Sequence, residues 1–179
     1  TLVGPTSVGV ISPEKAKIGP IGGNRPSDAY DKGRVGIISK SGGMTTETAQ
    51  VIQKAGYGIS TAMDIGGDKI VGTSFVDALK MFEKDDQTDA VVIFGELGGT
   101  YENQVAQFLK NNSDFSTPVI AFITGKFTED MPSQQYGHAG AVIRGDRDKP
   151  SYKEKVLRES GVHVVDVHHE IGEKLREVL

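Results

Sequence analysis

The sequence predicts an α/β fold in which a mainly parallel, five-stranded sheet carries helices on both faces. Five short apolar runs alternate with five stretches of helical periodicity from residue 34 to the end of the chain. Turns rich in glycine separate these runs. Parallel strands need crossover connections, so this alternation of strand and helix indicates a parallel sheet with helices packed against it.

The first 33 residues are expected to form an irregular connector, because glycine and proline recur throughout them. Short extended pieces are expected there only at residues 2–3 and 8–11. Within residues 34–179, apolar runs of strand length lie at 34–39, 59–65, 90–97, 118–124 and 162–167. Stretches with helical spacing of apolar residues lie at 42–55, 73–84, 100–111, 151–160 and 168–179.

The composition of the 179-residue chain suits one folded domain and disfavours several classes of protein. Hydrophobic residues make up 37% and charged residues 25%, so a buried core can form. The net charge is −4 and no basic block is present, which argues against a nucleic-acid platform. No apolar run could cross a bilayer, no signal peptide is recognisable, and cysteine is absent. A cytoplasmic protein that contacts neither membrane nor nucleic acid is expected.

One histidine stands in an unusual setting. His138 lies between Gly137 and the small residues Ala139, Gly140 and Ala141, so no bulky neighbour hides its imidazole. Such a ring can act as a nucleophile or proton shuttle near neutral pH. The plain alternative is a turn histidine without a function. His163, His168 and His169 lie in or after the last strand, where structural or solvent-exposed roles are expected.

The turn after the first expected strand has the composition of a phosphate-binding turn. Ser41, Gly42 and Gly43 open the helix that follows, and free backbone N–H groups at a helix N-terminus bind anions. The turn lacks both the Walker ending and the spacing of the dinucleotide fingerprint. The alternative is a serine N-cap on a tight turn.

A glutamate closes the third and most apolar expected strand. A buried carboxylate is costly, so Glu96 should have a partner such as a histidine, a ligand or a backbone donor. Ligands bind beyond the carboxyl ends of parallel strands, where the residues that follow each strand meet. Asp64 and Asp68, after the second strand, are expected to be solvated turn carboxylates. A phosphoryl group carried on His138 would use both the phosphate-binding turn and Glu96.

These residues resemble a known family. The stretches Gly4-Pro5, Lys17-Ile18-Gly19, Ser39-Lys40-Ser41-Gly42, Ile65-Gly66-Gly67-Asp68, Gly95-Glu96-Leu97-Gly98-Gly99 and Gly137-His138-Ala139-Gly140-Ala141 stand in the order found in succinyl-CoA synthetase alpha subunits and in the related part of ATP-citrate lyase. The resemblance covers nearly the whole chain. It implies a flavodoxin-like CoA-ligase domain of an acid–CoA ligase, in which His138 is phosphorylated, Glu96 positions it, and Ser41, Gly42 and Gly43 bind the phosphate.

The same resemblance implies parts that this chain does not contain. Residues 1–33 would connect to a CoA-binding domain that precedes Thr1 and is missing here. An ATP-grasp beta subunit, or a fused equivalent, would bind ATP or GTP with Mg²⁺, and the complete enzyme would use CoA. No metal ligand is assigned to this chain, and the chain alone is expected to be inactive.

Three departures from succinyl-CoA synthetases are similar to the citrate-using branch, which contains ATP-citrate lyase and citryl-CoA synthetase. They are the Thr6-Ser7-Val8 loop, the Gly43-Met44 pair in the phosphate-binding turn, and the longer loop at residues 132–136. Citrate is therefore slightly favoured over succinate, with Thr6, Ser7 and Met44 as candidate substrate-binding residues.

Two other functions remain open. The first is a non-catalytic, flavodoxin-like regulatory or ligand-binding domain, which would centre on acidic strand ends rather than on a histidine. The second is a dinucleotide-binding domain, which the missing fingerprint disfavours.

Overall fold

The computed structural model describes residues 1–131 and 134–179, so Pro132 and Ser133 of the longer loop lie outside the described residues. It confirms the α/β class. The sheet has the order β2-β1-β4-β3-β5-β6-β7. Its strands are β1 (Gly9–Ser12), β2 (Ala16–Ile18), β3 (Lys32–Ser39), β4 (Ile59–Asp64), β5 (Ala90–Glu96), β6 (Val119–Thr124) and β7 (His163–Val165). The helices are α1 (Gly42–Lys54), α2 (Phe75–Phe82), α3 (Tyr101–Asn111), α4 (Pro150–Arg158) and α5 (Ile171–Val178).

The five expected strands, β3 to β7, are all present and pair in parallel. The first of them, β3, lies between the second and the third, which is the flavodoxin-like strand order. Ser39 is in register with Asp64 on β4 and with Phe94 on β5, so all three strands end at the same edge. The point where the order reverses, between β3 and β5, is where such sheets place their ligands.

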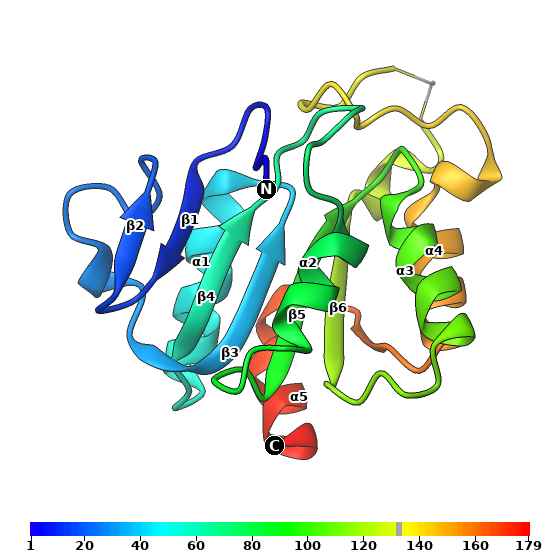
Figure 1. The fold of residues 1–179 in the computed structure, drawn as a ribbon. Helices are drawn as coiled ribbons and strands as arrows, with labels where there is room; N and C mark the ends of the chain where they lie inside the picture. The colour runs from blue at the N-terminus through cyan, green and yellow to red at the C-terminus, as the bar shows by residue number, and fades with distance from the viewer. Residues whose placement is uncertain (132–133) are drawn as a thin grey trace.

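The extended piece expected at residues 8–11 is present as β1, but the expectation of an otherwise irregular connector is wrong at β2, residues 16–18. β1 pairs antiparallel with β4 and with β2, which extends the sheet to seven strands (Figure 1). Gly9 and Gly19 have left-handed φ values of 104° and 92°. A Cβ on Gly9 would lie 1.9 Å from the carbonyl oxygen of Ile18, so these glycines permit close pairing instead of ending it. The extended piece expected at residues 2–3 is not a strand.

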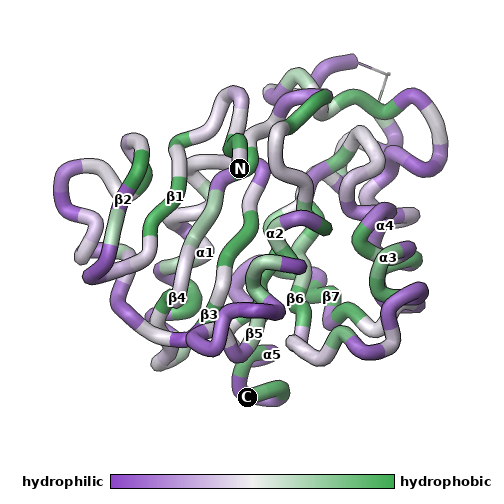
Figure 2. Tube along the Cα trace, in the orientation of Figure 1, coloured by the Kyte–Doolittle hydropathy of each residue, from purple (hydrophilic) through white to green (hydrophobic). Residues whose placement is uncertain are grey.

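Two hydrophobic cores cover the two faces of the sheet. One contains buried residues of α1 and α5, including Ile52, Ile171 and Leu175. The other contains buried residues of α2, α3 and α4, among them Phe75 and Leu157. Figure 2 shows the hydrophobic colour on the central strands and hydrophilic residues in many of the outer turns. The helices thus cover both faces, as the sequence predicts.

The last two elements are shorter than expected. β7 spans three residues, and a 3₁₀ turn at His168–Glu170 precedes α5.

Within the described part of the chain, none of the helices combines the length and apolar character that a membrane crossing requires.

Candidate active site

The loop between β6 and α4 carries His138 over the edge where the parallel strands end (Figure 1, yellow). Two backbone hydrogen bonds fix its position. The N–H of Gly140 donates to the carbonyl of Gly67, in the turn after β4, at 2.9 Å, and the N–H of Tyr136 donates to Ala141 at 2.9 Å. The first bond ties the loop to the turn after β4, and the second closes the loop on itself around the histidine.

His138 meets Glu96, the last residue of β5. Nδ1 of the imidazole lies 2.6 Å from Oε2 of the carboxylate. The His138 side chain is 36% exposed and that of Glu96 only 6%. An ionised carboxylate can only accept a hydrogen bond, so we assign the imidazole proton to Nδ1. Nε2 then keeps its lone pair, as a nucleophile requires.

Gly67 packs directly against the His138 ring. A Cβ at this position would lie 2.3 Å from Cγ and 2.5 Å from Nδ1 of the imidazole. Real Cβ atoms do not approach other atoms so closely, so any side chain here would displace the ring or the loop. The absence of a side chain at Gly67 therefore permits the imidazole to lie in this orientation.

Replacement of Gly67 by alanine is expected to move His138 away from Glu96. The rate of histidine phosphorylation in the complete enzyme should then fall by about 100-fold, because small misplacements of a reacting group have costs of this size. Gly145→Ala serves as a steric comparison outside the phosphate-binding turn, because a Cβ there meets nothing within 4 Å. Transfer of label from γ-labelled nucleotide measures the rate. An undiminished rate in a folded Gly67→Ala variant would contradict the assigned contact.

Three buried charged side chains, Lys40, Glu102 and Lys153, lie behind Glu96. Nζ of Lys40 lies 3.2 Å from Oε1 of Glu96 and 3.9 Å from Oε1 of Glu102, and Lys153 pairs with the other oxygen of Glu102. Burial alone would raise the pKa of Glu102, but Lys153 and Lys40 lower it. Burial would lower the pKa of Lys40, yet Glu102 and Glu96 raise it above its usual value. Both residues are therefore ionised at neutral pH.

Lys153 also supports the turn that follows β5. Its ammonium donates to the carbonyl of Glu96 at 2.8 Å and to the carbonyl of Gly98. Burial lowers the pKa of Lys153, and the Glu102 carboxylate opposes that effect. Sequence reasoning missed Lys40, Glu102 and Lys153. The position of Lys40 inside the phosphate-binding turn was the one available signal.

The expected phosphate-binding turn opens α1 at the same edge. Ser41 occupies the N-cap position without a side-chain cap, so its hydroxyl does not occupy the first-turn N–H groups. Its own N–H donates to Oγ of Ser39 at 3.0 Å. A Cβ on Gly42 would collide with Val8 at 2.4 Å, whereas Gly43 faces open space. The free amides and the space beside Gly43 suit a phosphate or a carboxylate.

The loop before β1 packs against the turn after β4. The N–H of Val8 donates to Oδ2 of Asp64 at 2.7 Å, and a Cβ on Gly66 would lie 2.1 Å from the carbonyl of Pro5. Thr6 and Ser7 therefore lie near this edge. The expected solvation of Asp64 is wrong: its side chain is buried, because it accepts from two backbone amides. Burial raises its pKa and those amide hydrogen bonds oppose the rise.

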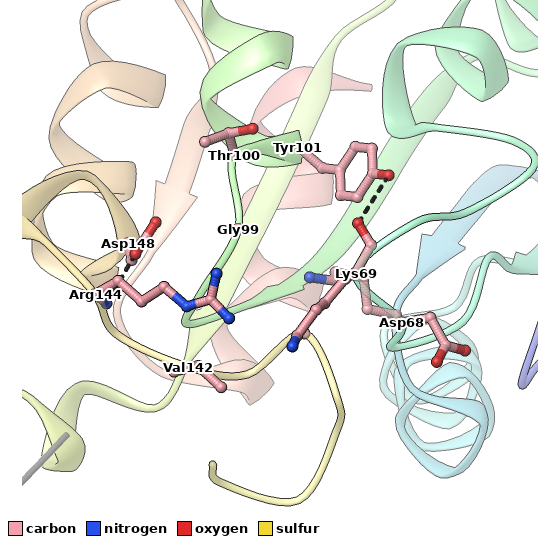
Figure 3. A pocket seen from close by; sticks show the side chains of 10 residues that line it. Asp68, Lys69, Gly99, Thr100, Tyr101, Val142, Arg144 and Asp148 are labelled. Carbon is pink, nitrogen blue, oxygen red and sulfur yellow. Dashed lines mark hydrogen bonds between the residues drawn. The ribbon is translucent and has the colours of Figure 1, made fainter. Parts of the chain in front are cut away.

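A cavity of about 280 Å³ lies beside the His138 loop (Figure 3). Lys40, Lys69 and Arg144 line it, together with the start of α3 and Gly140 of the loop. The Tyr101 hydroxyl forms part of its wall and donates to the carbonyl of Lys69 at 3.4 Å. Figure 3 shows the Arg144 and Lys69 side chains pointing toward one another across the opening. The edge thus carries positive charge close to the histidine.

Two further site expectations concern other histidines and metals. His168 accepts from or donates to Thr48 at 2.9 Å and packs against Phe94 and Phe122, so its role is structural, as predicted. Burial lowers its pKa. Among the residues that the structure describes, no three His, Asp or Glu side chains are grouped to bind a metal ion.

Comparison with known proteins identifies the family. The family model described as CoA-ligase matches residues 38–171. The chain belongs to the CoA-ligase family. This CoA-ligase chain is 40% identical, over 178 residues, to the alpha 1 subunit of an ADP-forming succinate–CoA ligase of Archaeoglobus fulgidus. The aligned region covers 99% of this chain and 58% of the relative. It is 43% identical over 174 residues to the corresponding alpha subunit of Staphylococcus epidermidis, covering 97% of this chain and 55% of that one.

Solved structures agree with this assignment. An ATP citrate lyase from Methanothrix soehngenii, determined with citrate and coenzyme A, superimposes with a TM-score of 0.92 at 32% identity. The match covers 98% of this CoA-ligase chain and 29% of the lyase chain. The resemblance to succinyl-CoA synthetase alpha subunits and ATP-citrate lyase is thereby confirmed. The chain spans somewhat more than half the length of the curated relatives it matches.

Proposed function

We propose that this chain is the phosphohistidine-carrying part of a nucleotide-dependent acid–CoA ligase. The observation that carries the proposal is the 2.6 Å contact between Nδ1 of His138 and Glu96, which leaves Nε2 of a partly exposed ring as the free nucleophile. The membership in the CoA-ligase family supports it. A non-catalytic domain would have no need of a partly exposed histidine hydrogen-bonded to a buried glutamate at the end of β5.

In the first step, the Nε2 lone pair of His138 attacks the terminal phosphorus of a nucleoside triphosphate. An N–P bond forms, the bond from that phosphorus to the bridging oxygen breaks, and the nucleoside diphosphate leaves with the bonding electrons. The imidazole becomes positively charged because Nδ1 keeps its proton. The Glu96 carboxylate, which already accepts from Nδ1, stabilises that charge as it develops.

In the second step, a carboxylate oxygen of the acid attacks the phosphorus. The N–P bond breaks, its electrons return to Nε2, and an acyl phosphate and neutral His138 result. The thiolate of CoA then attacks the acyl carbon, a C–S bond forms, and inorganic phosphate leaves. The free first-turn amides of α1, after Ser41, are placed to bind the phosphoryl oxygens during transfer.

The remaining parts of the enzyme follow from the family. We propose a CoA-binding domain joined to residue 1, and an ATP-grasp beta subunit or fused equivalent that binds ATP or GTP with Mg²⁺. Both relatives named above are alpha subunits by name. The chain alone would then form no acyl-CoA. A cytoplasmic location stays a prediction.

The chemistry can be tested by loading and discharging the histidine. The complete enzyme is incubated with γ-labelled nucleotide, freed of nucleotide, and then given acid and CoA. We expect label on this chain that is stable at high pH and lost at low pH. Addition of the carboxylic acid substrate together with CoA should release the label as inorganic phosphate, with formation of the thioester. Label that stays on the chain after the carboxylic acid substrate and CoA are added would favour a regulatory domain instead.

We propose citrate ahead of succinate as the acid. The observation that favours it is the open space beside Gly43, where a Cβ would meet nothing within 4 Å at the start of α1. A bulkier tricarboxylate could approach the first-turn amides there. Thr6, Ser7 and Met44 remain candidate contacts, since the loop before β1 lies near the same edge. The curated relatives carry succinate in their names, so the two acids must be compared directly.

We expect kcat/KM to be higher for citrate than for succinate in the complete enzyme, by about 10-fold or more. The reason is that the wrong acid leaves buried hydrogen-bond donors unpaired, which costs about 1–3 kcal/mol per group. Steady-state assays of thioester formation with both acids measure the ratio. A preference for succinate would leave the phosphohistidine chemistry intact and assign this chain to the succinate-using branch.

A further inference from the structure

Lys40 is a lysine buried at the centre of the site without a role in the chemistry described above. It follows β3 directly, and its side chain is 1% exposed. Its ammonium lies between Glu96 at 3.2 Å and Glu102 at 3.9 Å, and 5.9 Å from the centre of the Tyr101 ring. An isolated buried ammonium is strongly unfavourable, so its presence depends on these carboxylates.

Oε1 of Glu96 depends on Lys40 in turn. Oε2 of Glu96 is taken by His138. Within the described residues, Oε1 is buried and has no hydrogen-bond partner of good geometry. The Lys40 ammonium is the group close enough to offset its charge. A second carboxylate, that of Glu102, lies near as well, because it accepts from the backbone N–H of Glu96 at 3.2 Å.

The charge balance shows what Lys40 prevents. With Lys40 present, two ammonium groups face the carboxylates of Glu96 and Glu102. Without it, two neighbouring carboxylates would share Lys153, which is bonded to Glu102 and to two backbone carbonyls. Two close carboxylates with too little positive charge take up a proton. Glu96 would be the one protonated, because Lys153 stays on Glu102.

Protonation of Glu96 would change the tautomer of His138. A carboxylic acid donates its proton, so Nδ1 would accept the hydrogen bond and the ring proton would move to Nε2. The lone pair on Nε2 would be lost and no N–P bond could form there. An incorrect histidine tautomer costs about 10⁴-fold in serine proteases.

We propose that Lys40 is a positioning residue that keeps Glu96 ionised and so fixes the His138 tautomer with its lone pair on Nε2. This inference rests on the proposed function. It distinguishes Lys40 from Lys153, whose contacts include two main-chain carbonyls and therefore support the fold. The Lys40 ammonium has side-chain carboxylates and one aromatic ring as its neighbours.

Several titratable groups face Lys40, and each bears on the pH dependence. Those beside its ammonium are Glu96 at the end of β5, Glu102 and Tyr101 on α3, and Lys153 on α4. His138 and Asp64 interact with Glu96, and Asp68, Lys69, Arg144 and Asp148 line the same cavity as Lys40. Loss of the Lys40 charge removes a cation from beside the neighbouring carboxylates of Glu96 and Glu102, which favours uptake of a proton by that pair. The acidic limb of the pH profile should therefore move to higher pH.

The test compares Lys40→Met with Lys40→Arg in the complete enzyme. The rate of His138 labelling from γ-labelled nucleotide is measured from about pH 5 to 9. For Lys40→Met we expect a loss of about 10-fold at neutral pH and an acidic limb moved upward by about one pH unit. KM for nucleotide should be unchanged, since Lys40 acts through Glu96. Lys40→Arg keeps the charge and should recover most of the rate. Lys110→Met, at an exposed ion pair on α3, is the matched control.

A double variant keeps the test decisive if Lys40→Met folds poorly. In Glu96→Gln the side chain at position 96 is already neutral, so adding Lys40→Met should cause no further loss of labelling rate, whereas independent effects would add. The proposal is overturned if folded Lys40→Met keeps the wild-type rate and pH profile, if Lys40→Arg is as slow as Lys40→Met, or if the two substitutions are additive. Absence of label in the wild-type enzyme would instead reject the proposed function itself.

Discussion

His138→Ala is expected to abolish phosphoryl transfer from nucleotide to this chain, with a loss of at least about 10⁴-fold in the complete enzyme. Removal of a covalent nucleophile has effects of this size or larger. The fold should survive, because the ring is 36% exposed and Glu96 keeps Lys40 as a partner. We expect a stability loss of about 1 kcal/mol from the missing hydrogen bond. Covalent labelling and thermal unfolding measure the two quantities.

His169→Ala is the matched control, because His169 is an exposed histidine remote from Glu96. It should retain full labelling. Label that persists on His138→Ala would remove His138 from the mechanism and require another acceptor on this chain.

Lys153→Met is expected to destabilise the fold by about 3–5 kcal/mol, because it leaves the fully buried Glu102 carboxylate with one partner fewer and removes a donor from two backbone carbonyls. Urea denaturation of the chain measures the free energy of unfolding. The double variant Lys153→Met with Glu102→Leu should recover much of this loss, because removing both charges leaves no unpaired ion.

Lys110→Met provides the comparison for that experiment. Lys110 pairs with Glu159 at 3.4 Å, but both side chains are about half exposed, so the pair contributes about 0–1 kcal/mol. A loss below about 1 kcal/mol for Lys153→Met would contradict the structural role that we assign to the buried charges.

The sequence allowed the meeting of Glu96 and His138 to be predicted. Glu96 closes a strand with almost no other charge, and residues that follow parallel strands share one edge of the sheet. That reasoning needs only the alternation of strands and helices. It does not need any knowledge of which helix packs on which strand.

The partners behind Glu96 could not be predicted in this way. Glu102 and Lys153 lie on α3 and α4, where charged residues usually face solvent. Their burial depends on the packing of two helices that are far apart in the sequence. A period of 3.6 residues gives the face of a helix but not the neighbour that it meets.

The same limit explains β1 and Asp64. Glycine and proline in residues 1–33 indicate breaks, yet the pairing of β1 with β4 joins segments more than fifty residues apart. Asp64 resembles a turn carboxylate in the sequence. It is buried because that pairing brings the Val8 amide to it at 2.7 Å. Non-local contacts, rather than local propensity, decided both cases.

The measurement that tests the central claim most directly is phosphorus–nitrogen NMR of the phosphorylated chain with ¹⁵N-labelled histidine. The structure engages Nδ1 of His138 with Glu96, so we predict that the phosphorus couples to Nε2 of this histidine. Coupling to Nδ1, or phosphorylation of any residue other than His138, would contradict the account.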